Sequence, residues 1–275
     1  MKKERADKLL VQQGFAESID KAQRIIMTGK VITDKNERVD HAGELFPMET
    51  MFRIKGKSSA YVSRGGYKLE KAIQLFDVDI KNKILLDIGS STGGFTDAAL
   101  QHGAHLSYAL DVGTNQLAWK LRQDPRVVVM EQTNFRYSKP EDFTQGRPSI
   151  ASIDVSFISL KLILPVLKHI LEDNGDVLAL IKPQFEADRD EIGPKGIVQD
   201  RNIHKKVVDN ILASAVQEGY DVLGLDFSPI TGGEGNIEFL AHLRSSTNDI
   251  GEISESIDTA EVIDRAHQRF FNHRS

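Results

Sequence analysis

Hydrophobic positions follow two different periods along most of the chain, and these periods predict its elements. Short runs of aliphatic residues alternate with stretches in which apolar residues recur every three or four positions. The runs predict strands and the recurring stretches predict helices, and such an alternation implies a mostly parallel, doubly wound α/β sheet. The predicted strands are 84–87, 104–110, 126–130, 150–153, 176–181, 220–227 and 237–243, and the predicted helices are 69–76, 95–100, 116–122, 159–171 and 203–217.

A smaller pattern precedes this α/β region. Residues 5–12 and 18–29 have the spacing of short amphipathic helices, and short β-like segments follow at 31–33 and 50–54. Two helices and a small ribbon make a module with only a small core. At the other end, 259–271 predicts a helix that docks on the main body.

Composition is that of an ordinary globular protein, with 40% hydrophobic and 27% charged residues. The absence of cysteine excludes disulfides and thiolate metal sites, and the histidines have no metal-ligand spacing, so we expect no metal. His169 and His204 are expected to be surface or helix residues. No apolar run approaches the roughly 20 residues of a membrane helix, and no export signal is visible. These features favour a cytoplasmic protein.

The net charge of −5 is unevenly distributed. Residues 1–70 hold 14 Lys and Arg against 10 Asp and Glu, a charge of +4, so the remainder carries −9. A basic head on an acidic body indicates that the head binds a polyanion, although a chance fluctuation of this size is the alternative.

The stretch 83–97, Lys-Ile-Leu-Leu-Asp-Ile-Gly-Ser-Ser-Thr-Gly-Gly-Phe-Thr-Asp, carries the strongest local signal. A strand runs into a glycine loop and then into a helix, which suits a nucleotide-like cofactor because the backbone can approach it closely. An ordinary βα turn is the alternative. Asp111 lies about 20 residues further on, where an acid can bind a ribose hydroxyl. The spacing Gly89-x-x-x-Gly93-Gly94 argues against a nicotinamide dinucleotide.

Ionisable residues close four of the predicted strands: Asp87, Asp111, Asp154 and Lys182. Ligands of open α/β sheets bind at the carboxyl ends of the strands, so these side chains are expected at one edge.

The head resembles the S-four RNA-binding domain over roughly residues 3–57. The matching positions are Arg5-x-Asp7-x-Leu9-Leu10, Gly14, Ser18, Ala22, Ile25-Ile26 and Gly29-Lys30-Val31. The match departs at Ile19, where such domains often carry a basic residue, and in the turn 33–35. The resemblance implies RNA binding, for which we assign Arg5, Lys8, Arg24, Lys30 and, beyond the head, Arg64.

The α/β region resembles the class I S-adenosylmethionine-dependent methyltransferases. That resemblance implies a Rossmann-like, mostly parallel seven-stranded sheet with helices on both faces. It also implies that the glycine loop holds the methionine end of the cofactor, that Asp111 holds the ribose, and that residues 131–134 lie near the adenine. The implied cofactor-binding residues are Asp87, Gly89, Ser90, Ser91, Thr92, Gly93, Gly94, Phe95, Asp111, Val112, Glu131, Asn134 and Asp154.

A narrower resemblance is to the FtsJ type, whose members carry a Lys-Asp-Lys-Glu tetrad and methylate ribose 2′-oxygens. The candidates are Lys68 in Arg-Gly-Gly-Tyr-Lys-Leu, Asp154 in Ile-Asp-Val-Ser-Phe, Lys182 in Leu-Ile-Lys-Pro-Gln-Phe-Glu and Glu238 in Gly-Asn-Ile-Glu-Phe. Together with the S-four-like head they resemble the TlyA/haemolysin A family. That family implies cytidine 2′-O-methylation of small- or large-subunit ribosomal RNA, with ribosomal RNA or ribosomal subunits as partner, and neither DNA nor membrane. We expect a monomer.

The implied chemistry gives each tetrad residue a task. A ribose hydroxyl must lose its proton as it attacks, and Lys182 can accept that proton only when neutral. Asp154 and Glu238 would orient the two amines. Glu238 lies inside a predicted strand, so an outward-facing surface residue is its alternative.

The expected organisation is an S-four-like domain (1–58), a linker (59–67), an FtsJ-like methyltransferase domain (68–245) and a tail with a helix (246–275). The charged segment 186–200 is expected to be a lid or a surface loop. Three rival functions stay open: an RNA-binding protein without activity, a membrane-active haemolysin, and a methyltransferase for DNA or protein.

Overall fold

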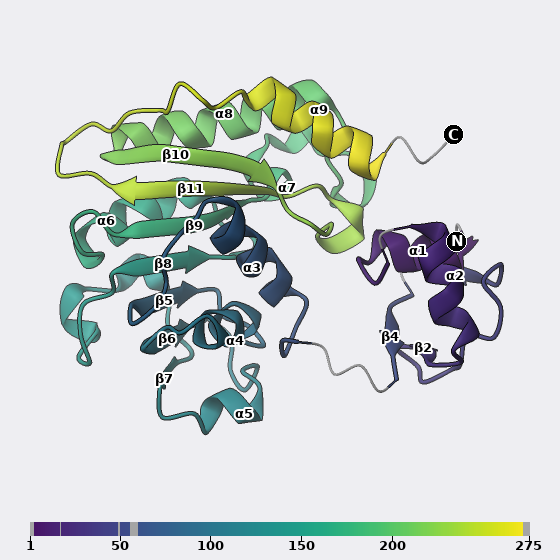
Figure 1. Ribbon diagram of the computed structural model, residues 1–275. Coiled ribbons are helices and arrows are strands. Elements are labelled where there is room, and N and C mark those ends of the chain that lie inside the picture. Colours follow the sequence, from purple (N-terminus) through teal and green to yellow (C-terminus); the bar gives the residue numbers. More distant parts are fainter. Residues whose placement is uncertain (1–2, 17, 49, 56–59, 272–275) are drawn as a thin grey trace. The chain divides into compact units, whose positions relative to one another are not determined.

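The computed structural model describes residues 3–16, 18–48, 50–55 and 60–271 (Figure 1). Contacts divide the chain into two compact units. The smaller unit is Met1–Ala60 with Pro229–Gly235, and the larger unit is Tyr61–Ser228 with Asn236–Ser275. The expected boundary at 58/59 lies outside the described residues. Within the described ranges, no helix combines the length and apolar character needed to cross a membrane.

The smaller unit consists of two helices and two antiparallel strand pairs. Its elements are β1 (Lys3–Arg5), α1 (Ala6–Gln12), α2 (Ile19–Met27), β2 (Val31–Thr33), β3 (Leu45–Pro47) and β4 (Phe52–Ile54), with β1 pairing β3 and β2 pairing β4. The Ser18 side chain accepts a hydrogen bond from Lys21 N and so caps α2. A small apolar core joins the helices to the strands. The strands β1 and β3 were not predicted, because Lys3–Arg5 contains no apolar residue and Leu45–Pro47 ends in proline.

The larger unit is built on the seven-stranded sheet that the resemblance implied. The strands run in the order β10 (Tyr220–Phe227), β11 (Phe239–Ser245), β9 (Asp176–Ile181), β8 (Ile150–Ile153), β5 (Ile84–Ile88), β6 (Leu106–Leu110) and β7 (Val127–Met130). Strands β5 to β9 pair in parallel, whereas β11 is antiparallel to both of its neighbours. This is the Rossmann-like α/β architecture.

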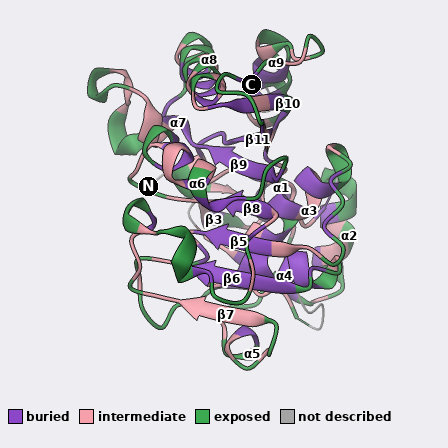
Figure 2. Cartoon of the chain, turned by 90° about the vertical axis from the view of Figure 1, so that its left-hand side faces the viewer, coloured by how far each residue is buried: buried purple, intermediate pink, exposed green. Residues whose placement is uncertain are grey.

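Helices cover both faces of this sheet because successive strand residues point to opposite sides. Along β9, Leu178 and Leu180 pack in one buried cluster, with α3 (Gly65–Leu75) and α4 (Gly94–Gln101). Val177 and Ile181 pack in the other, with α6 (Leu164–Ile170), α8 (Arg201–Gln217) and α9 (Thr259–Phe270). Figure 2 shows the central strands buried and the edge strand β7 only partly covered. The remaining short helices are α5 (Trp119–Arg122) and α7 (Pro183–Glu186).

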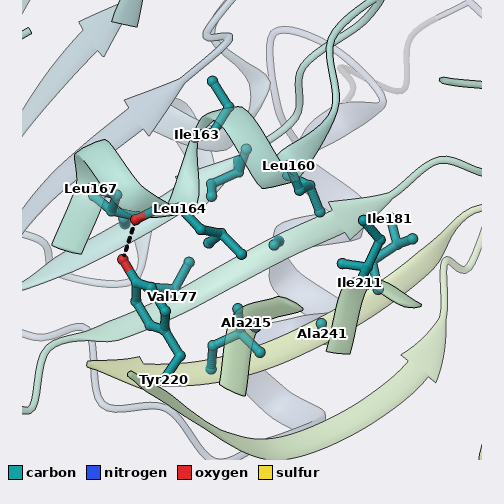
Figure 3. Close-up of a cluster of buried hydrophobic side chains, with 14 of the residues drawn as sticks. Leu160, Ile163, Leu164, Leu167, Val177, Ile181, Ile211, Ala215, Tyr220 and Ala241 are labelled. Carbon is teal, nitrogen blue, oxygen red and sulfur yellow. Dashed lines mark hydrogen bonds between the residues drawn. The ribbon is translucent and has the colours of Figure 1, made fainter. Parts of the chain in front are cut away.

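Figure 3 shows the second cluster, in which α6 and α8 lie against β9 and β11. The buried Tyr220 hydroxyl donates to the Leu164 carbonyl at 2.9 Å, so the phenol is satisfied inside an apolar environment. On the same side of the sheet, α9 buries Val262, Ile263 and Ala266, which agrees with a docked terminal helix.

Two expectations about residues 61–69 need correction. Helix α3 begins at Gly65 rather than at residue 69, and Tyr61 is buried, so 61–67 pack within the larger unit instead of forming a linker. His204 lies on α8, in agreement with a helix residue; it is fully buried, and its ring bonds His267 of α9 at 2.8 Å. The segment 186–200 contains short helical turns at 189–191 and 194–196, and Lys206 lies within 3.0 Å of Asp188 and Glu191 at the first of them.

A charged cluster closes the amino end of β9. Asp176 Oδ1 accepts from His242 Nε2 at 3.0 Å and from Arg244 Nη2 at 2.8 Å, and Lys83 Nζ lies 3.3 Å from Oδ2. Burial alone would raise the pKa of this carboxyl, but its hydrogen bonds and the neighbouring cations outweigh burial and hold the pKa well below its usual range.

We therefore predict that Asp176→Asn lowers the free energy of unfolding at pH 7 by about 2 kcal/mol, because it weakens the hydrogen bonds and ion pairs that the buried carboxylate makes with the partly exposed Arg244 and Lys83. The folded pKa is the lower one, so this stabilisation is complete above the unfolded value of about 4 and is lost as the pH falls below it. Urea unfolding should show the gap between variant and wild type narrowing below about pH 4. The exposed neighbour Asp173, replaced by Asn, is the control, and equal effects of the two substitutions would contradict the prediction.

Candidate active site

The candidate site lies where the chain reverses its course across the sheet. From β5 the chain moves outward to β6 and β7, and it then returns to the other side of β5 to form β8 and β9. The loops that follow β5 and β8 therefore lead away in opposite directions, which is where open α/β sheets bind ligands. The antiparallel β11 begins at this same edge, because Phe239 pairs with Ile181, the last residue of β9.

This edge brings the four predicted tetrad residues together. Lys68 Nζ lies 2.6 Å from Glu238 Oε2 and 3.7 Å from Asp154 Oδ2. Lys182 Nζ lies 2.5 Å from the other oxygen, Asp154 Oδ1. The four side chains thus form one row of alternating charge, Glu238–Lys68–Asp154–Lys182, contributed by α3 and by the ends of three strands.

The alternative that Glu238 is an outward-facing surface residue within a strand is wrong. It precedes β11 instead of lying within it, and it is 2% exposed. A carboxylate this deeply buried requires a partner, and the Lys68 ammonium supplies one.

Neighbouring charges set the protonation states of Lys68 and Asp154. Burial alone would lower the pKa of the Lys68 ammonium, but the Asp154 and Glu238 carboxylates outweigh it and raise that pKa. Burial alone would raise the pKa of Asp154, but Lys68 and Lys182 outweigh it and hold that pKa below its usual range. At neutral pH, Lys68 therefore stays an ammonium and Asp154 a carboxylate.

The predicted glycine loop lies beside Asp154. Gly89 has φ +84°, and a Cβ there would come 2.4 Å from the Asp154 carbonyl oxygen. Gly93 has φ +94°, and a Cβ there would meet Leu121 Cδ1 at 2.3 Å. Both positions thus require glycine for conformation and for space. The loop leads into α4, whose first residue is Gly94.

Two of the acidic residues predicted to bind the cofactor accept hydrogen bonds from backbone N–H groups in this structure. Asp111, directly after β6, accepts from Ser91 N at 2.8 Å and from Gly113 N at 2.7 Å. Glu131, directly after β7, accepts from Asn115 N at 3.0 Å and also pairs with Arg122. These carboxylates tie the loops after β5, β6 and β7 to one another. Val112 is exposed beside Asp111, and Asn134 caps a short helical turn through Arg136 N.

Asp87 differs from the other predicted cofactor residues because it is fully buried. Its carboxylate accepts from Thr96 N at 3.0 Å, from Thr96 Oγ1 at 2.8 Å and from Ser152 Oγ at 3.0 Å. Burial nevertheless raises the pKa of Asp87 to about 7. Asp87 therefore supports the glycine loop through its bonds to Thr96 and Ser152.

The basic residues assigned to RNA belong to different parts of the chain. In the smaller unit, Arg5 pairs with the buried Asp7 at 2.6 Å, and Arg24 pairs with Asp20 at 2.9 Å on the surface of α2. Lys8 lies 3.6 Å from Glu4, and Lys30 is exposed. Arg64 instead belongs to the larger unit, where it occupies the N-cap position of α3 without a side-chain capping bond, and burial lowers its pKa.

Sequence reasoning missed three residues that lie beside the tetrad. Phe157 is 91% exposed, and its ring lies 4.8 Å from that of Phe185, centroid to centroid. The Lys182 Nζ is 5.9 Å from the centre of the Phe185 ring and donates to Ser156 Oγ at 3.4 Å. Their positions in the sequence could have indicated them, because Phe157 follows Asp154 by three residues and Phe185 follows Lys182 by three residues.

Comparisons with known proteins agree with this architecture. The model of the FtsJ-like methyltransferase family matches residues 61–245. YqxC of Bacillus subtilis, provisionally named an rRNA methyltransferase, is 55% identical over 97% of this chain and 95% of its own. The 16S/23S rRNA (cytidine-2′-O)-methyltransferase TlyA of Mycobacterium tuberculosis is 38% identical, and the match covers 89% of this chain and 91% of TlyA. A solved structure from Streptococcus thermophilus, provisionally named a hemolysin, has TM-score 0.79 and 54% identity over 99% and 98% of the two chains.

Fold and site together define a class I methyltransferase, an enzyme with a Rossmann-like sheet and a glycine loop at its reversal point. The chain belongs to the FtsJ-like methyltransferase family.

The raised pKa of Asp87, which supports the glycine loop, can be tested by the pH dependence of stability. The folded protein holds this proton up to about pH 7, whereas the unfolded chain releases it near pH 4, so this group makes stability fall as the pH rises between those values. Asp87→Asn removes the titration. Relative to wild type, the variant should gain about 1 kcal/mol per pH unit between pH 5 and 7 in urea unfolding. Parallel stability curves for the two proteins would show that Asp87 does not titrate in this range.

Proposed function

We propose that this enzyme transfers a methyl group from S-adenosylmethionine to a ribose 2′-hydroxyl of ribosomal RNA. The observation that carries the proposal is the row Glu238–Lys68–Asp154–Lys182, closed by contacts of 2.6, 3.7 and 2.5 Å beside the glycine loop. The nucleotide is inferred from the relatives: TlyA of Mycobacterium tuberculosis is named for cytidine 2′-O-methylation of 16S and 23S rRNA, so we propose cytidine in one or both subunits as the target.

In this mechanism Lys182 receives the proton of the attacking hydroxyl. The 2′-oxygen would form its bond to the methyl carbon as the bond from that carbon to the donor's sulfur breaks, which leaves a neutral thioether. Its O–H bond would break in the same process, and the proton would pass to Lys182 Nζ. Asp154 holds that amine at 2.5 Å, and Lys68, fixed as an ammonium, holds the other oxygen of Asp154. Positioning does much of the rest, because methyl transfer needs an in-line approach.

The residues present fit the proposed cofactor. The loop from Gly89 to Gly93 leads into the N-terminus of α4, where helix N–H groups can face a ligand, and Asp111 offers a carboxylate at the next strand end. S-adenosylmethionine would supply a methyl group activated on a sulfonium. We assign the methionine end to the glycine loop and the ribose to Asp111, with Glu131 and Asn134 on the adenine side.

RNA recognition is assigned to two features. An exposed aromatic ring such as Phe157, beside the tetrad, offers a face on which a base can stack. Arg5, Lys8, Arg24 and Lys30 of the smaller unit, which we propose is an S-four-like domain, would bind phosphates, and Arg64 would act beside the tetrad. A ribose 2′-hydroxyl exists only in RNA, so the same chemistry excludes DNA as substrate.

The direct test replaces the proton acceptor. We predict that Lys182→Ala lowers the rate of methyl transfer to ribosomal subunits by about a hundred- to ten-thousandfold, the usual contribution of a general base. RNA binding, measured by filter retention, should stay unchanged. Mapping ribose methylation on subunits treated with wild-type enzyme identifies the nucleotide in the same experiment.

Lys182→Arg is the matched control, because guanidinium keeps the charge but does not release its proton. This variant should be as inactive as the alanine variant. An active arginine variant would rule out Lys182 as proton acceptor. A wild-type enzyme that binds ribosomal RNA without methylating it would favour the rival function, an RNA-binding protein without activity.

A second prediction tests the cofactor assignment. Asp111→Ala should weaken S-adenosylmethionine binding about ten- to a hundredfold, because hydrogen bonds to a charged group contribute about 1.5–3 kcal/mol. Titration calorimetry measures this directly, with Asp173→Ala as an exposed control at the opposite end of the sheet. An affinity within about twofold of wild type would place the ribose elsewhere.

A further inference from the structure

The loops after β8 and β9 are joined by side chains beyond the point where their strand ladder ends. The ladder's last pair is Ile153 with Ala179. Further out, Asp154 contacts Lys182, and the rings of Phe157 and Phe185 pack at 4.8 Å. The two loops carry the central pair of the tetrad, so their separation sets the geometry of that pair.

Glu186 makes the outermost of these links. It is the last residue of α7, and its two oxygens accept from consecutive residues of the other loop. Ser159 Oγ donates to Oε2 at 2.5 Å, and Leu160 N donates to Oε1 at 2.8 Å. The Glu186 side chain thus accepts a hydrogen bond from the backbone N–H that begins the helical turn Leu160–Leu162, a group that has no partner within the turn. It also anchors the segment 154–160 to the loop after β9.

The segment that Glu186 anchors contains a strained residue. Phe157 has φ +63°, a left-handed conformation that costs a non-glycine residue about 1–2 kcal/mol. Phe157 is 91% exposed, so burial of its ring does not offset the cost of this conformation. Such a conformation persists only where the surrounding structure holds it. Asp154 holds the segment at its beginning, and Ser159 and Leu160 hold it at its end through Glu186.

We propose that Glu186 is a positioning residue for methyl transfer: by clamping Ser159 and Leu160 it keeps Asp154 against Lys182. The effect on catalysis rests on the proposed function. Glu186 itself does not touch the reacting atoms, and it acts only through the separation of the two loops.

The test compares Glu186→Ala with Glu186→Gln in the full-length enzyme acting on ribosomal subunits. The alanine variant loses both acceptors, and its kcat should fall about tenfold or more, because small misplacements of catalytic groups are costly. The dissociation constant of S-adenosylmethionine, measured by calorimetry, should stay within about twofold, because the residues assigned to the cofactor, Asp154 apart, lie on β5 or follow β5, β6 and β7. The glutamine variant should keep most of the activity, because its oxygen still accepts from Leu160 N and its amide can donate to Ser159 Oγ.

A readout that needs no activity accompanies the kinetics. Chymotrypsin cleaves after exposed aromatic residues in mobile backbone, so cleavage after Phe157 should be several-fold faster in Glu186→Ala than in wild type or Glu186→Gln. Glu172→Ala, an exposed acid at the opposite end of β9, is the control and should change neither measurement.

Unchanged kcat and unchanged cleavage in Glu186→Ala would overturn the proposal, as would equal losses in the alanine and glutamine variants. If the alanine variant does not fold, Ser159→Ala removes one of the two bonds, and its unchanged kcat and cleavage would overturn it equally. An inactive wild-type enzyme would instead refute the proposed function, and the cleavage rates would still decide whether Glu186 holds the loop.

Discussion

The buried row formed by the amines of Lys68 and Lys182 and the carboxylates of Asp154 and Glu238 is the constraint on which the larger unit depends. Each charge has lost most of its water, and it is tolerated only because the next group in the row replaces that water. Removal of one member leaves another buried without a partner. The four residues come from α3, from the loops after β8 and β9, and from the start of β11. The sheet must therefore be assembled in the correct order before any of these charges is stable at its position.

Strand direction explains how this row forms. Parallel strands place their carboxyl ends at one edge, which brings Asp154 and Lys182 to it. A residue preceding a further parallel strand would lie at the opposite edge. Because β11 runs antiparallel, the residue before it, Glu238, arrives opposite the end of β9 and can bind Lys68. The reversed strand is thus a requirement of the site as well as a feature of the fold.

Two kinds of carboxylate support this edge without joining the row. Asp87 lies beneath the glycine loop and holds Thr96 and Ser152, whereas Asp111 and Glu131 hold backbone N–H groups of neighbouring loops. Glu186 does the same for the loop after β8. Loops have few internal hydrogen bonds of their own, so side-chain acceptors of this kind restrict their conformations. A site made of loops can in this way be nearly as well positioned as one built on strands.

The alternation of strands and helices, the glycine loop and four candidate tetrad residues could be predicted from the sequence, because these predictions depend on local periodicity and on recognisable motifs. The prediction misjudged the start of α3, since the glycines at 65 and 66 weaken the helical signal, and it left Glu238 open as a surface residue. The burial of Asp87, the bond between His204 and His267, and the contact of Phe157 with Phe185 became visible only in the folded structure. Burial and partners depend on which strands become neighbours, and strand order is a property of the assembled sheet that no local stretch of sequence contains.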